Sequence, residues 1–207
     1  MTAPLPTPQQ SLGDVDELPT VVFGSRSLMW WGTVGFAVIE GWTLALIAAM
    51  YFYIRQNFRT WPPIDTPLPS RLIPTINLAV MLVSILPTIL YDRASRRLDA
   101  GAVKLWLLVS SLLSIAIVVL RWYECWALNV RWDSNAYGSA AWLLVVTHGT
   151  LLILDAADTI GLTLFYWIKR MPIKAMSDVH DNGFYWYFMV GVWIPIYLIV
   201  YLGPYVF

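Results

Sequence analysis

Five ionisable side chains stand inside apolar stretches of this 207-residue sequence, and they are the residues most able to do chemistry. Glu40 is the only charged residue between Ser27 and Ile54. At the centre of a bilayer such a group costs roughly 2.5 kcal/mol or more, so it seldom faces lipid. Carboxylates and imidazole could carry protons, or could bind iron, manganese or zinc. The other four candidates are Glu124, His148, Asp155 and Asp158.

The spacing of these residues predicts how they are used. His148, Asp155 and Asp158 lie seven and three residues apart, which places them on one face of a helix. Two neighbouring carboxyls would share protons in dry surroundings. We expect this stripe to point into a bundle or toward a partner chain, and a hydrated pocket is the alternative. Candidate hydrogen-bond partners of the two carboxyls are Glu124, Tyr187 and the tryptophans.

The two glutamates invite separate interpretations. Glu124 follows Arg121 by three residues, a spacing that favours a local ion pair. Glu40 is expected to be protonated or hydrogen-bonded against a neighbouring helix, with a proton-linked role as the alternative. Ligation of a metal by His148 is the less common use of a lone histidine, because such a residue more often bonds one helix to another.

Long helices must hold these groups. Apolar residues make up 58% of the chain, which also carries 12 Trp, and its mean hydropathy is +0.62. A hydrocarbon core about 30 Å thick needs roughly 20 residues of helix. We therefore predict an all-α membrane protein, with a flexible cytoplasmic tail over residues 1–27 and one membrane domain over 28–207. Its five predicted spans are 28–54, 72–91, 104–126, 137–168 and 184–206.

Charge and aromatic residues orient the spans. Five spans put the termini on opposite sides, and eight Lys and Arg fall on the side of the N-terminus against five on the other. Because cytoplasmic loops carry the excess of these residues, the N-terminus is predicted to be cytoplasmic and the C-terminus external. Aromatic residues gather at span ends and are interpreted as interface anchors. They include Trp30, Trp31, Tyr51 to Tyr53, Trp61, Trp122, Trp126, Trp132, Tyr166 and Trp167.

Composition also excludes several functions. Cys125 is the only cysteine, so the chain cannot form an internal disulfide or supply a cysteine-rich metal site. No dense block of basic residues indicates a nucleic-acid partner. Haem bound by two histidines needs both at similar depth, and His180 is expected in a polar loop with Asp178 and Asp181. We therefore expect no haem or copper in this chain.

Six sequence segments occur in the order typical of one family. They are WWGTVGFAVIEGW followed by WPP, LIPTINLAVMLVS, RWYECW, DSNAYGSAAW, THGTLL and FYWYFMVGVW. This order resembles subunit III of the haem–copper oxidases, in its five-helix bacterial form, from about Ser27 to Tyr201. Departures are also present. Leu151 and Tyr187 replace histidines of the family, Val190 replaces an aspartate, and Asp155 stands where a glycine is usual.

The resemblance implies a noncatalytic accessory subunit of a respiratory terminal oxidase in the bacterial inner membrane. In such a complex it would pack against the haem-bearing subunit I, with subunit II nearby, and haem and copper would lie in those partners. Its first two helices and remaining three would splay into a V that holds phospholipid. Glu40 matches the buried glutamate of the family that reacts with carboxyl reagents.

The sequence is also compatible with other functions. The family also includes accessory proteins of nitric oxide reductases and subunits of quinol oxidases, and the sequence does not separate cytochrome c from quinol as electron donor. A membrane metalloenzyme could use Glu40, Glu124, His148, Asp155 and Asp158, although no paired Glu-x-x-His motif is present. A small proton-coupled transporter is a further alternative, for which no internal repeat is visible.

Overall fold

The computed structural model describes residues 21–169 and 171–206, and most of the predicted tail lies outside these residues. All of the regular structure in the described residues is helical. Five helices are long and apolar enough to cross a membrane, which confirms the predicted fold class. The last helix continues through a π-helical turn and a final 3-10 turn to Tyr205. The helices are α1 (Leu28–Arg55), α2 (Leu72–Arg96), α3 (Ala100–Ala127), α4 (Ala136–Ile168) and α5 (Met176–Tyr197).

Two helices extend well beyond the apolar segments that predicted them. Helix α2 runs on to Arg96, and α5 begins at Met176, eight residues before the predicted start at 184. Hydropathy marks where a helix enters hydrocarbon, whereas hydrogen bonding continues the helix into the polar layer. The expectation that His180 lies in a loop was therefore wrong, because His180 is in the second turn of α5.

Polar caps fix where α3 and α4 begin. The Asp99 side chain accepts hydrogen bonds from the backbone N–H groups of Gly101 and Ala102, both at 3.1 Å. The Asn135 side chain accepts one from the N–H of Gly138 at 2.8 Å. A Cβ atom at Gly138 would collide with the backbone carbonyl of Arg131, so this tight entry into α4 needs glycine.

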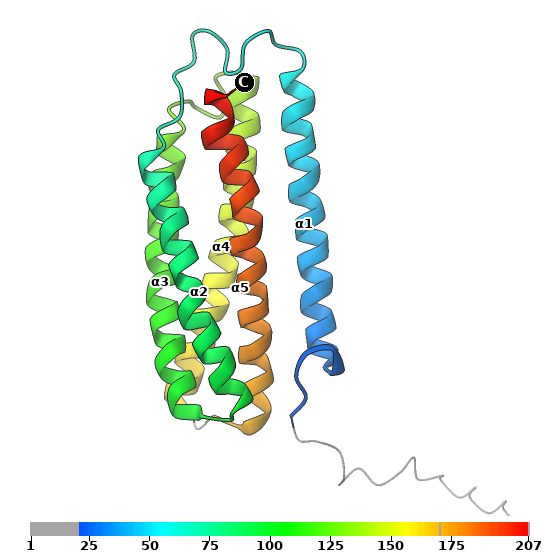
Figure 1. The fold of residues 1–207 in the computed structure, drawn as a ribbon, viewed down its shortest axis with the longest axis vertical. Coiled ribbons are helices and arrows are strands. Elements are labelled where there is room, and N and C mark those ends of the chain that lie inside the picture. The colour runs from blue at the N-terminus through cyan, green and yellow to red at the C-terminus, as the bar shows by residue number, and fades with distance from the viewer. Residues whose placement is uncertain (1–20, 170, 207) are drawn as a thin grey trace, which may run out of the picture.

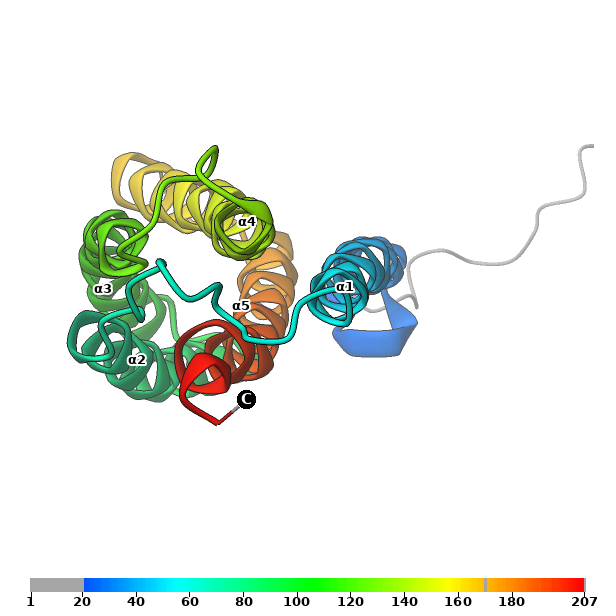
Figure 2. The same cartoon turned by 90° about the horizontal axis from the view of Figure 1, so that it is seen from above.

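Helices α2 to α5 form a ring when the molecule is viewed from above, and α1 stands outside it (Figure 2). Helix α2 packs along α3 and α5, whereas α1 packs on α4 and α5. The predicted pairing of the first two helices is therefore wrong. Their connecting segment, residues 56–71, crosses the end of the ring, so helices that follow one another in sequence are separated in space (Figure 1).

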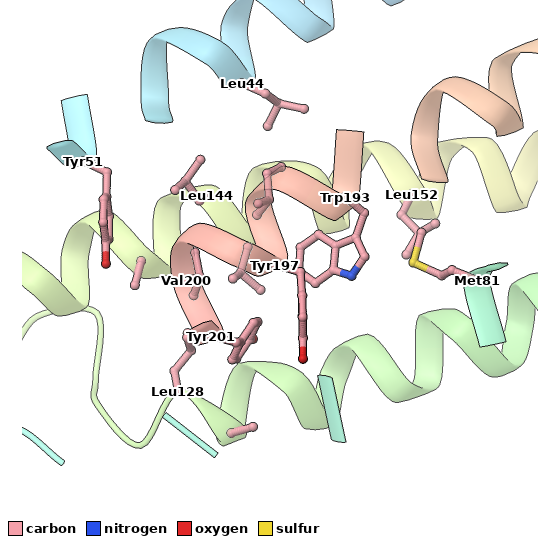
Figure 3. Packing of buried hydrophobic residues seen from close by; sticks show 14 of the residues in the cluster. Leu44, Tyr51, Met81, Leu128, Leu144, Leu152, Trp193, Tyr197, Val200 and Tyr201 are labelled. Atoms are coloured by element: carbon pink, nitrogen blue, oxygen red, sulfur yellow. The ribbon is translucent and has the colours of Figure 1, made fainter. Parts of the chain in front are cut away.

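The main core lies between the second half of α5, its continuation, and α4 (Figure 3). Trp193 and Tyr201 are fully buried there beside Leu144 and Leu152. Helix α1 contributes a much narrower seam. Its three buried residues lie seven positions apart, so a single stripe of α1 faces the ring and its other residues are partly buried or exposed. These residues are Ala37, Leu44 and Tyr51.

An aromatic cluster fastens the end of α1 to the ring. Trp61, which follows α1, packs edge-on against Tyr51 with ring centroids 5.4 Å apart and against Tyr137 at 5.2 Å. Tyr51 is fully buried and Trp61 is 4% exposed. The interpretation of these two residues, and of the buried Tyr166, as interface anchors was therefore wrong. The exposed Trp122, Trp126, Trp132 and Trp167 keep that interpretation as a prediction.

Candidate functional site

A cleft of about 1100 Å³ lies between α1 and α4, and residues of α5 also line it. Leu28 and Phe36 of α1 and Leu154 of α4 give it apolar walls. Glu40, Asp155 and Asp158, three of the five residues selected from the sequence, line the same cleft. Four further polar residues come from α5, and the sequence analysis did not assign them to a site. They are Asp178, Asp181, Asn182 and Tyr185.

Glu40 joins α1 to α5. Its carboxylate accepts a short hydrogen bond from the hydroxyl group of Tyr185, and the Glu40 residue is only partly buried. The next residue, Gly41, allows a close approach, because a Cβ atom there would lie 3.2 Å from the ring of Phe188. The expected hydrogen bond to a neighbouring helix is present, and it stands at the edge of a cleft.

The two aspartates of α4 have different surroundings. The side-chain amide of Asn182 donates to Asp158 at 3.1 Å and to the hydroxyl of Thr159 at 3.0 Å, and the hydroxyl of Tyr91 donates to Asn182 at 3.1 Å. Asn182 thus replaces the partners expected for Asp158. Asp155 is 4% exposed and faces the cleft, and its Oδ2 atom has no hydrogen-bond partner among the described residues.

Glu124 and His148 belong to a second polar cluster, inside the ring. Arg121 pairs with Glu124 at 2.5 Å, as the three-residue spacing favours, and both side chains are buried. The Arg121 guanidinium lies 3.4 Å from the centre of the Trp193 ring and 3.4 Å from Nδ1 of His148. Nε2 of His148 lies 3.1 Å from the carbonyl of Met189, so the proton of the neutral ring is assigned to Nε2.

A third cluster was missed by the sequence analysis because His180 was expected in a loop. Nδ1 of His180 lies 2.5 Å from a carboxylate oxygen of Asp92, and Arg96 approaches both groups. The ring of Phe23 packs edge-on against His180, with centroids 5.8 Å apart. The four-residue spacing of Asp92 and Arg96 was the available signal. Part of the segment before α1 is thereby held against α5.

We expect the bond between Glu40 and Tyr185 to make a small, measurable contribution to stability. Glu40→Gln keeps an acceptor for the tyrosine hydroxyl and should melt close to the wild type. Glu40→Leu leaves that partly buried hydroxyl without its partner, which costs about 1 kcal/mol. Melting in detergent, followed by tryptophan fluorescence, measures the difference. The double variant Glu40→Leu with Tyr185→Phe should recover part of the loss, and equal melting of all variants would contradict the prediction.

The cleft and the two other polar clusters have different chemical capacities. In each of the two clusters the charged groups are paired with one another, which suits positioning of helices. The cleft is open and combines apolar walls with carboxylates, which suits an amphiphilic ligand. Among the described residues, no three His, Cys, Asp or Glu side chains are placed together as a metal site would require.

Three curated proteins share sequence similarity with most or much of this chain, and all three are named cytochrome c oxidase subunit 3. The protein from Synechocystis sp. is 26% identical over 189 residues, covering 86% of this chain and 77% of its own length. The Bacillus subtilis protein is 24% identical over 82% of the chain and 84% of its own length. These similarities support the cytochrome c oxidase subunit III family for this chain. No family model matches it.

The third protein, from Alkalihalophilus pseudofirmus, is 25% identical over 59% of the chain and 62% of its own length. The recognition made from six ordered segments is thus confirmed by similarity along most of the chain. Of the four departures from the family pattern, Asp155 lines the cleft. Leu151, Tyr187 and Val190 are not among the residues that line it.

Proposed function

We propose that this chain is a noncatalytic accessory subunit of a respiratory haem–copper oxidase of the cytochrome c oxidase type. The similarity to three proteins named cytochrome c oxidase subunit 3, over as much as 86% of the chain, carries the proposal. In that role the chain contacts the haem-bearing subunit I, and haem and copper reside in its partners. The five apolar helices support a multi-pass position in the membrane.

We infer that the chain fulfils this accessory role in part by binding phospholipid in the cleft. Its walls carry exposed apolar side chains of α1 and α4, and its polar side begins at the first turn of α5. A phospholipid would place acyl chains along the apolar walls and its headgroup at the polar end. On the proposed orientation, with a cytoplasmic N-terminus in the bacterial inner membrane, this polar end faces the cytoplasm.

We expect an affinity tag on this chain to retrieve a haem-bearing protein from membranes solubilised in mild detergent. Mass spectrometry identifies the partners, and the absorption spectrum of the eluate should contain a Soret band. The chain expressed without its partners should show no Soret band, because it offers one histidine in the membrane core and one cysteine. Recovery of a haem assigned to ligands in this chain would refute the accessory role. Retrieval of a nitric oxide reductase or quinol oxidase would change the partner and keep the role.

A further inference from the structure

The polar side of the cleft between α1 and α4 is rich in carboxylates, and the nearest basic group to Asp181 on α5, His180, is paired with Asp92. Five acidic residues line it, and none of the described lining residues is Lys, Arg or His. Lys169, just beyond α4, places its ammonium group 5.1 Å from the centre of the Phe165 ring. The acidic residues are Glu40, Asp155, Asp158, Asp178 and Asp181.

Two of the lining aspartates are buried and are incompletely hydrogen-bonded within the described part of the chain. Asp155 is 4% exposed and Asp181 is 6% exposed, and both line the cleft. Oδ2 of Asp155 and both carboxylate oxygens of Asp181 have no hydrogen-bond partner among the described residues. Buried polar side chains in proteins nearly always have partners. These two residues therefore call for a ligand that donates hydrogen bonds or carries positive charge.

The carboxylates lie near the membrane-surface end of the cleft. Asp178 and Asp181 occupy the first two turns of α5, and Asn182 reaches Asp158, which places Asp158 at the same level. From Asp178 to Tyr185, the partner of Glu40, the helix advances about 10 Å. Headgroups occupy the outer layer of a bilayer, so the acidic end of the cleft is within reach of a lipid headgroup.

We propose that the cleft selects a phospholipid with a primary ammonium headgroup, as in phosphatidylethanolamine, over an anionic phospholipid. This inference rests on the proposed function, since it names the headgroup of the lipid in the same cleft. An ammonium group offers three hydrogen-bond donors and a positive charge to the carboxylates. An anionic headgroup would face carboxylates of like charge. A compact metal ion fits poorly, because the described acidic residues form no cluster of three possible ligands.

Electron spin resonance of the purified oxidase complex in phosphatidylcholine vesicles tests this selection. Spin-labelled phosphatidylethanolamine and phosphatidylglycerol, with identical labelled chains, are compared through their motionally restricted fractions. We expect the wild type to prefer the ammonium lipid about threefold, the size of a partly screened ion pair. The double variant Asp158→Asn with Asp181→Asn should bring this ratio toward one. Asp133→Asn, in an exposed loop pair with Arg131, is the matched control and should leave the ratio unchanged.

A cleft-filling variant separates this site from other lipid sites on the complex. Gly32 lines the cleft, and a Cβ atom there would meet nothing within 4 Å, so Gly32→Trp can fill it. Gly35→Trp, on the same helix and equally free of contacts, does not belong to the cleft lining and is the control. The motionally restricted lipid that is present in the wild type and lost in Gly32→Trp is the lipid of this cleft. The headgroup preference is calculated from that difference.

The outcomes separate the two proposals. Loss of restricted lipid in Gly32→Trp without any preference for ammonium would overturn the headgroup selection and leave lipid binding intact. No loss in Gly32→Trp would overturn both. Preference for phosphatidylglycerol in the wild type, or a structure of the complex with a basic side chain of a partner subunit on Asp181, would also overturn the headgroup selection.

Discussion

Arg121→Met should destabilise the protein by about 3 to 5 kcal/mol, because it leaves the buried Glu124 carboxylate without its ion-pair partner. The pair is 2.5 Å long and both side chains are at most 5% exposed, so water cannot replace the guanidinium without local opening. The same change removes the cation from the face of Trp193 and a donor to His148. Melting of the purified chain in detergent, and the yield of assembled complex, measure the effect.

A double variant shows whether the loss comes from the stranded charge. Arg121→Met with Glu124→Gln removes both charges and keeps similar side-chain volumes, and replacement of a whole buried pair costs much less than removal of one partner. We expect the double variant to regain most of the melting temperature. If the two variants melt alike, the packing of Arg121 on Trp193 rather than the ion pair accounts for the stability.

Trp61→Ala should cost about 3 to 5 kcal/mol, the range found when a buried tryptophan is truncated. Trp61 is 4% exposed and packs against the rings of both Tyr51 and Tyr137, so its removal leaves a cavity where α1 meets the ring. Loss of this contact should also loosen the end of α1 and make the segment that follows it more accessible to protease. Melting in detergent and limited proteolysis of the segment 56–71 report the two effects.

Trp132→Ala is the matched control for this prediction. Trp132 lies in the loop between α3 and α4, and it is 63% exposed. Its truncation should change melting in detergent by much less than that of Trp61. Equal effects would mean that Trp61 acts through detergent or lipid contact, and the aromatic cluster would not be the fastening of α1.

The sequence predicted the membrane helices well because apolar length is a local property. All five spans were found, and the spacing of Arg121 and Glu124 correctly indicated their ion pair. The start of α5 was missed because a helix continues past hydrocarbon wherever its backbone can bond to itself. The burial of Trp61 was missed because its neighbours, Tyr51 and Tyr137, come from two different helices.

The site was only half predictable for a related reason. Helical periodicity placed His148, Asp155 and Asp158 on one face, but that face meets two environments, since His148 points at Arg121 while the aspartates reach the cleft. Which helix faces which is a property of tertiary packing. Consequently Asn182 and Tyr185, the actual partners of Asp158 and Glu40, could not be identified by spacing along one helix.

Because α1 packs against α4 and α5, it cannot be packed until those two helices have been synthesised. Tyr185 follows Glu40 by 145 residues, which a ribosome adding 5 to 20 residues per second needs roughly 7 to 30 s to translate. Helices α2 and α3 can form a hairpin during that interval, but α1 must wait in the membrane with its glutamate unpaired. The first helix to emerge is therefore among the last to be packed. Newly made chains pass through a stage in which Glu40 depends on lipid, water or an assembly factor for its hydrogen bonds.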